Sequence, residues 1–337
     1  MRYSRVALDG LAYELAPNVV TSSELEKRIE PVYTSLRFQV GQLEALTGIR
    51  ERRWWSEGFQ LSDGAAGAGR KALDKAGVNP QDIGVVIYAG VCKQSCEPAT
   101  ACAVASKLGV SMDCVVLDIS NACLGVMSGI VDIANRIELG QIRAGLVVSC
   151  ESAREINESM IKSMLANPTL EHFKLSMSTL TGGSGAVGVV LTDGSFGKAG
   201  PRLLGGTIQA APRHWDLCRW DRDFMRTDAP AVLKNGLELA RLTWQNFTEI
   251  LGWSGVDLDK AICHQVGGPH SAAFLLACGI DPGKNFPTYE FLGNIGTVSL
   301  PLTAAIADER GFLNKGDHVG FLGIGSGLNC MMLGWEW

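Results

Sequence analysis

The stretch of sequence that decides the fold is VVLDISNACLG, which runs from Val115 to Gly125. Its first five residues are mostly β-branched or apolar and predict a strand over 115–119. A tight turn follows, and the apolar spacing beyond it predicts a helix over 125–139. Cys123 therefore opens a helix, where unpaired N–H groups and the positive end of the helix dipole favour a thiolate. Cys123 is a candidate nucleophile, although an isolated cysteine in such a place is as often a buried core residue.

The chain on either side of this stretch alternates strand-like and helix-like segments. Strands are predicted over 83–90, 144–149 and 186–191, where β-branched and small apolar residues are concentrated. Alternation of this kind is typical of an α/β fold with helices packed on sheets.

Two of these segments have counterparts in the second part of the chain. Residues 82–87 resemble 257–262, and residues 144–148 resemble 319–323, both at an offset of 175 residues. A constant offset indicates a duplicated α/β unit. We therefore expect an N-terminal half, 1–195, and a C-terminal half, 196–337.

Each pair of repeated segments brackets a turn that contains Gly and Asn and leads into a helix. These turns are 121–125 in the first half and 293–296 in the second. Equivalent turns of two packed halves are expected to meet near a shared centre. The sequence therefore predicts a composite site built from both halves.

Two residues of the second half are candidates for that site. His264 ends a predicted strand, and such a position faces the usual ligand crevice of α/β sheets. Asn294 lies in the 293–296 turn. Both side chains can donate a hydrogen bond to a developing oxyanion. Each alone is more often structural, but together with Cys123 they predict an active site.

These residues and their neighbours resemble the Cys-His-Asn set of ketoacyl synthase III and its relatives in the thiolase superfamily. The matching segments are NACLG at 121–125, HQ at 264–265 and GN at 293–294, joined by TGIRERR at 47–53 and GIGSGLN at 323–329. The resemblance covers essentially the whole chain. It implies a thiolase-like, five-layered αβαβα fold made from two duplicated halves, the first holding Cys123 and the second His264 and Asn294.

One branch of that superfamily is more similar still, the OleA-type enzymes that condense two fatty acyl-CoAs head to head. CEPAT at 96–100 resembles the segment that holds the catalytic glutamate of that branch, here Glu97. HQVGGPH at 264–270 and the Trp-terminated C-terminus are also similar. In that branch the glutamate reaches in from the partner subunit, so the resemblance implies a homodimer.

The resemblance implies an acyltransferase that carries out a non-decarboxylative Claisen condensation. Cys123 would be acylated by a first acyl-CoA, with the backbone N–H groups of Cys123 and Ser326 holding the oxyanion. His264 and Asn294 would stabilise the enolate of a second acyl-CoA after Glu97 removes its α-proton. The product would be a 2-alkyl-3-oxoacyl thioester. CoA thioesters are then substrates, and no metal or organic cofactor is expected.

The chain departs from ketoacyl synthase III at several positions. Gly267 stands where that family usually has Asn, and a basic residue expected near Pro269 is missing, which makes docking of acyl carrier protein doubtful. Gln42 and Leu46 replace the aromatic residue and the arginine that clamp the adenine of CoA in that family.

Two other functions fit parts of the pattern. The first is decarboxylative condensation of an acyl-CoA with a malonyl thioester, as in 3-oxoacyl-ACP synthase III, which needs no carboxylate base; only Glu97 separates it from the head-to-head reaction. The second is a non-catalytic subunit of a condensing enzyme. Such subunits commonly lack the nucleophile, so the presence of Cys123, His264 and Asn294 argues against it.

Composition and sequence pattern exclude several further classes of protein. With a net charge of −5 the chain has no basic footprint for nucleic acid. Its apolar runs, such as 83–92, are far shorter than a membrane span, and its first residues lack the apolar core of a signal peptide. The ten cysteines are therefore expected to be reduced thiols in the cytoplasm. Cys92, Cys96 and Cys102 lack the spacing of a metal site.

Overall fold

The computed structural model describes residues 1–198, 200–221, 223–253 and 257–337. Within these ranges nine strands form one sheet, in the order β11-β12-β13-β8-β1-β7-β6-β4-β5. Their bounds are β1 (Ala7–Leu15), β4 (Val85–Ala89), β5 (Val115–Ile119), β6 (Ala144–Glu151), β7 (Gly185–Thr192), β8 (Arg202–Ala210), β11 (Lys260–Cys263), β12 (His318–Gly325) and β13 (Asn329–Glu336).

The sheet repeats one pairing pattern on either side of its centre. From β1 outward, β7 and β6 pair antiparallel and β4 then pairs parallel to β6. From β8 outward, β13 and β12 pair antiparallel and β11 then pairs parallel to β12. β4 and β11 come from one predicted repeat pair, and β6 and β12 from the other. β1 and β8 are joined at the single pair Ala7 and Arg202.

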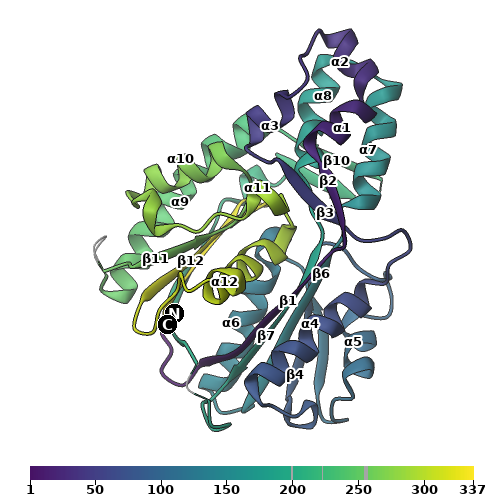
Figure 1. Ribbon diagram of the computed structural model, residues 1–337. Coiled ribbons are helices and arrows are strands. Elements are labelled where there is room, and N and C mark those ends of the chain that lie inside the picture. The colour runs from purple at the N-terminus through teal and green to yellow at the C-terminus, as the bar shows by residue number, and fades with distance from the viewer. Residues whose placement is uncertain (199, 222, 254–256) are drawn as a thin grey trace.

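Helices cover these strands in layers (Figure 1). α4 (Leu61–Ala76) and α5 (Thr100–Leu108) pack with the outward side chains of β4 and β6 in one apolar cluster. α9 (Ala229–Leu251) and α10 (Gly268–Cys278) form a second cluster with β11, β12 and β13. α6 (Gly125–Glu138) and α12 (Ser299–Glu309) lie between the two parts of the sheet, in a third cluster that takes side chains from both.

These layers confirm the predicted five-layered αβαβα fold. The order is α4 and α5, then β5-β4-β6-β7-β1, then α6 and α12, then β8-β13-β12-β11, then α9 and α10. Residue 195 falls between β7 and β8. Because one sheet runs through both parts, the division into halves 1–195 and 196–337 stays a prediction.

A separate group of elements, which we call the cap, stands at one end of the layers (Figure 1). It is held by an apolar cluster that includes Leu25, Ile29, Met160 and Phe173. Its elements are α1 (Ser22–Arg28), α2 (Glu30–Leu36), α3 (Gln42–Thr47), α7 (Arg154–Ala166), α8 (Leu170–Ser176), β2 (Asn18–Thr21), β3 (Glu51–Trp54), β9 (Cys218–Asp221) and β10 (Phe224–Thr227). α11 (Tyr289–Leu292) lies beside β3 and leads toward α12.

The local predictions agree with this structure within a few residues. The strand predicted over 115–119 is β5, and the predicted helix over 125–139 is α6. β6 extends two residues beyond its predicted end, to Glu151. No helix in the described ranges meets the length and hydropathy that a membrane crossing requires.

The contact between α4 and β7 is close enough to give a test of the packing. A Cβ added to Gly188 of β7 would lie 2.5 Å from the carbonyl oxygen of Ala68 and 2.7 Å from its carbon. These are backbone atoms, which move only if the helix moves. We expect Gly188→Ala to lower the free energy of unfolding by about 1–3 kcal/mol, measured by denaturant titration.

Gly67→Ala is the matched control on the same helix. Its Cβ would meet only the side chain of Glu14, at 3.3 Å. Because Ala favours a helix over Gly, the stability should stay equal or rise by up to about 1 kcal/mol. Equal losses in the two variants would contradict the packing argument.

Candidate active site

Cys123 lies in a strained turn between β5 and α6. The turn passes through Ala122, whose φ of 43° is unusual for a residue with a Cβ, and Cys123 then sits in the short helix η2 (Ala122–Leu124) directly before α6. The Asn121 side chain fixes the turn from both sides. Its Nδ2 donates to Ser128 Oγ at 2.9 Å, and its Oδ1 accepts from Asn329 Nδ2 at 3.0 Å. The predicted placement of Cys123 at a helix start is confirmed.

Two glycines of β12 let the second part of the sheet approach this turn. A Cβ on Gly323 would lie 2.5 Å from Leu124 Cδ2, and one on Gly325 would lie 3.4 Å from the Cys123 backbone nitrogen. Ser326, the next residue, lines the same pocket as Cys123. The structure therefore brings together the two residues whose N–H groups were predicted to hold an oxyanion.

His264 follows β11 and is almost fully buried, with 7% of its surface exposed. Its backbone N–H donates to Leu322 O at 3.0 Å, which ties it to β12. Within the described residues its Nδ1 has no hydrogen-bond partner. Burial, aided by the nearby His270, lowers the pKa of His264 to about 4. The ring is therefore neutral at physiological pH and can accept a proton.

Asn294 lies between α11 and the short helix η6 (Gly296–Val298). Its backbone N–H donates to Thr181 O at 2.9 Å, and its carbonyl accepts from the Gly183 N–H at 2.9 Å. The Gly296 N–H donates to the side-chain Oδ1 at 3.0 Å. Because this bond occupies the side-chain oxygen, the Asn294 amide offers its NH₂ group to the pocket.

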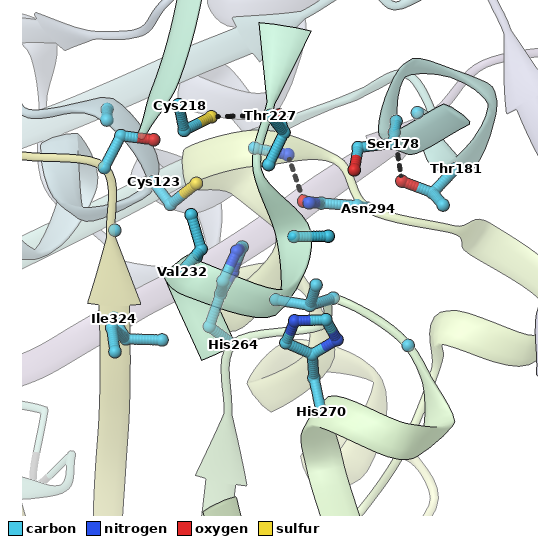
Figure 2. Close-up of a pocket in the computed structure, with 18 of the residues that line it drawn as sticks. Cys123, Ser178, Thr181, Cys218, Thr227, Val232, His264, His270, Asn294 and Ile324 are labelled. Carbon is cyan, nitrogen blue, oxygen red and sulfur yellow. Dashed lines mark hydrogen bonds between the residues drawn. The ribbon is translucent and has the colours of Figure 1, made fainter. Parts of the chain in front are cut away.

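The three side chains line one cavity of about 640 Å³ (Figure 2). Figure 2 shows Cys123, His264 and Asn294 around a common space, with Val232 between the cysteine and the histidine in this view. Most of the wall is apolar and comes from the cap, α9 and α10. The apolar residues include Ile156, Met177, Trp215, Trp220, Met225, Val232, Leu233, Leu237, Phe274 and Ile324.

The three methionines between residues 160 and 177 divide between this wall and the core. Met177 lines the cavity, whereas Met160 and Met164 are buried in the apolar cluster of the cap. These methionines therefore contribute both to the cavity lining and to the packing of the cap.

The ionisation of Cys123 differs from the expectation for a helix start. Burial, with smaller contributions from Cys218 and Glu151, raises the pKa of Cys123 to about 12. Its own backbone N–H acts in the opposite direction but does not compensate. Burial thus opposes the thiolate that a helix start favours, and reaction at neutral pH needs a group that takes the thiol proton.

Glu97 does not lie with the other predicted residues. It is exposed, on the loop between β4 and α5, and is not part of the cavity lining in the described chain. Val91 and Ser120, which follow the C-terminal ends of the neighbouring strands β4 and β5, do line the cavity. Within one subunit the structure thus assembles Cys123, His264, Asn294 and Ser326 but not Glu97.

Glu151 was not predicted from the sequence, but it lines the cavity and has only 2% of its surface exposed. It is the last residue of β6, a strand in which every residue is buried. A carboxylate that ends such an apolar run was the available signal. His270 and Cys218 also line the cavity and were not singled out. Among the described residues no group of His, Cys, Asp and Glu side chains is arranged to hold a metal ion.

A half-buried cysteine at a helix start, a neutral histidine and an asparagine amide meet here between two parts of a layered αβαβα structure. This combination defines a thiolase-fold condensing enzyme. Residues 48–196 match the N-terminal domain of thiolase, and residues 249–337 match the C-terminal domain of 3-oxoacyl-[acyl-carrier-protein] synthase III.

Comparison with individual relatives identifies the family within this class of enzyme. The acyl-CoA:acyl-CoA alkyltransferase of Shewanella oneidensis is 57% identical, with 100% of both chains covered. A cysteine-to-serine variant of Xanthomonas campestris OleA, crystallised with lauric acid and lauroyl-CoA, gives a TM-score of 0.96 at 38% identity, covering 99% of this chain and 100% of that one. A beta-ketoacyl-[acyl-carrier-protein] synthase III of Oceanobacillus iheyensis is 26% identical over 98% of this chain and 99% of its own. The chain belongs to the family of acyl-CoA:acyl-CoA alkyltransferases.

The low pKa of His264 gives a test of the site's electrostatics. Because its pKa is about 4 rather than the ordinary 6.5, His264 should stay neutral at every pH above about 5. In a pH titration of ¹⁵N-labelled histidines by NMR, the His264 ring should remain neutral from pH 7.5 to 5.5. Its signal should be missing in His264→Asn. A midpoint near pH 6.5 for that signal would contradict the burial argument.

Proposed function

We propose that this enzyme, an acyltransferase, condenses two fatty acyl-CoA thioesters by a non-decarboxylative Claisen reaction through an acyl-Cys123 intermediate. The observation that carries the proposal is the meeting of Cys123, His264 and Asn294 in one largely apolar cavity. The alkyltransferase and OleA relatives at 57% and 38% identity favour this reaction over the malonyl route of the synthase III relative at 26%.

The first stage transfers an acyl group to Cys123. Because the thiol is protonated at neutral pH, neutral His264 takes its proton as the sulfur attacks the thioester carbon. The N–H groups of Cys123 and Ser326 hold the oxyanion. The carbon–sulfur bond to CoA breaks, and the CoA thiolate takes the proton from His264. Acyl-Cys123 and free CoA remain.

The second stage joins the two acyl groups. The thioester oxygen of a second acyl-CoA accepts hydrogen bonds from His264 and from the Asn294 NH₂ group, which stabilise the enolate that forms when a base removes the α-proton. The α-carbon attacks acyl-Cys123, and the carbon–sulfur bond to Cys123 breaks. The base then gives up the proton and the released Cys123 sulfur takes one up, which restores the thiol and the free base. The product is a 2-alkyl-3-oxoacyl-CoA, and no metal or organic cofactor takes part.

The apolar cavity wall supports fatty acyl groups as substrates. Side chains such as Leu237 and Phe274 can cover an alkyl chain that would otherwise remain in water, at roughly 0.8 kcal/mol for each buried CH₂. The lauric acid and lauroyl-CoA bound to the Xanthomonas OleA variant are ligands of the same kind. The reducing cytoplasm suits the ten cysteines, and we place the enzyme there.

The base of the second stage is Glu97, supplied by the partner subunit of a homodimer. Its exposure on the loop between β4 and α5 supports donation to another chain. That loop follows β4, which pairs with β5, one of the two edge strands of the sheet; Val115, at the other end of β5, is 43% exposed. An exposed apolar edge strand is a ready site for pairing with a second copy. The Xanthomonas OleA structures include variants at a glutamate that precedes the varied cysteine by the same number of residues as Glu97 precedes Cys123.

A single-substrate reaction tests the main proposal. Purified enzyme given one long-chain acyl-CoA, without malonyl thioester, should release CoA and form the 2-alkyl-3-oxoacyl product, detected by mass spectrometry. The acyl adduct should be found on Cys123, and Cys123→Ser should lack it. An adduct on Cys218 or Cys263 would show that the nucleophile is misassigned. Product formed only with malonyl thioester would support the decarboxylative alternative.

Mixed dimers test whether Glu97 acts across the interface. Cys123→Ala and Glu97→Ala homodimers should each fail to condense acyl-CoA, although Glu97→Ala should still form acyl-Cys123. A hybrid dimer of the two, isolated with two affinity tags, has one site with an intact Cys123 and Glu97 from different chains. It should regain about half of the wild-type activity, because one of its two sites is complete. A hybrid as inactive as its parents would place the base elsewhere.

A further inference from the structure

Glu151 is a buried carboxylate beside the reacting cysteine that the reaction scheme above does not use. Burial raises its pKa, while the groups that most favour its charged form are N–H groups of Val91, Cys92 and Thr297 and the Cys92 thiol. An ionisable group taken out of water in this way is costly unless it is well hydrogen-bonded. Its contacts therefore indicate what it contributes.

The first set of contacts is with the loop that carries Glu97. The Val91 N–H donates to Glu151 Oε1 at 2.9 Å, and the Cys92 N–H donates to Oε2 at 2.9 Å. Both oxygens of the carboxylate thus hold the first residues after β4. The loop reaches Glu97 five residues beyond Cys92.

The far end of the same loop is held in the same way. The N–H groups of Thr100 and Ala101, which begin α5, donate to the two oxygens of Asp118, each at 2.9 Å. Asp118 belongs to β5, the strand that leads into the Cys123 turn. The Glu97 loop is therefore clamped at both ends by carboxylates whose strands end at the active site.

The second set of contacts is with the turn that carries Asn294. A Cβ on Gly296 would lie 3.2 Å from Glu151 Oε1, so the glycine backbone packs directly on the carboxylate. The Gly296 N–H is the group that orients the Asn294 side chain. Thr297, the next residue, accepts from the Val126 N–H at 2.7 Å and so joins this turn to the helix of Cys123.

We propose that Glu151 is a positioning residue that fixes the Glu97 loop and the Asn294 turn in one geometry, a role that rests on the condensation proposed above. With Glu97 acting across the dimer interface, the Glu151 of one subunit orients Asn294 in its own pocket and Glu97 for the partner's pocket. Its charge is not needed for acylation, because a nearby anion makes Cys123 harder to ionise.

Separate measurement of the two stages tests this role. In Glu151→Gln, one of the two acceptor oxygens becomes an NH₂ group while the side chain keeps its length. Acyl-Cys123 should form within about threefold of the wild-type rate, whereas kcat for condensation should fall by about 10- to 100-fold with little change in KM, the scale of a misplaced catalytic group. Size-exclusion chromatography with light scattering verifies that the variant is still a dimer.

Two further variants complete the design. Glu155→Gln is the matched control, because Glu155 is an exposed glutamate near the same strand end whose carboxylate accepts from Ser152 Oγ at 2.6 Å. It should keep both stages. Asp118→Asn loosens the other end of the Glu97 loop and should reduce condensation selectively as well. It provides the test if Glu151→Gln does not fold.

A hybrid dimer separates positioning of the loop from a local structural effect. One subunit carries Glu151→Gln together with Cys123→Ala, and the other is wild type, so the one working cysteine lies in an intact subunit. Because its Glu97 comes from the altered subunit, condensation should fall at least tenfold below that of the hybrid with Cys123→Ala alone.

The opposite results would overturn the proposal. Equal condensation by the two hybrids, or an equal loss of both stages in Glu151→Gln, would mean that Glu151 does not position the base. Wild-type enzyme in the same assay distinguishes the two hypotheses. If it makes no product from acyl-CoA, the condensation itself is wrong, whereas full activity of the variant counts only against Glu151.

Discussion

The close approach of β12 to the Cys123 turn is the constraint on which the rest of the site depends. A Cβ at Gly323 would overlap the Leu124 side chain, and one at Gly325 would lie 3.3 Å from Leu124 Cγ and in contact with Cys123. With glycine at both positions, the second part of the sheet can bring Ser326 to the cysteine and let Asn329 bond to Asn121. A larger residue at Gly323 would displace Leu124 at the point where the two parts of the sheet meet.

This approach also sets the electrostatics of the pocket. Cys123 and His264 lie where apolar side chains exclude water, and burial raises the pKa of the thiol and lowers that of the imidazole. Both effects favour the neutral form, so the resting pair is a thiol and an uncharged ring. A neutral pair suits a pocket that must admit two alkyl chains, because neither the sulfur nor the imidazole is left charged and desolvated between catalytic cycles. The cost is that proton transfer must accompany the attack on the thioester.

Much of this arrangement could be predicted from the sequence, for reasons that can be traced to particular residues. Local spacing predicts β5, the Cys123 turn and α6. The repeat offset identifies β11 and β12 as the counterparts of β4 and β6. His264 could be found because it follows a repeated strand, and Asn294 because it lies in a repeated turn. The protonation of Cys123 could not, since it depends on burial by α9 and the cap, which are distant in sequence. Glu151 was missed because its role appears only when Val91, Cys92 and Gly296 converge on it.

Duplication explains why the site joins two kinds of turn. The turn before α6 and the turn before α12 occupy equivalent places in the repeat, and both helices lie in the central layer. The first turn presents a nucleophile at a helix start, where N–H groups are available to an oxyanion. The second has its own N–H groups engaged, since Gly296 bonds to Asn294 Oδ1 and Ile295 bonds to Ser299 Oγ. It therefore offers a side-chain amide instead. In the reaction proposed above, one repeated unit thus provides two different oxyanion sites, one for each of two successive thioester carbonyls.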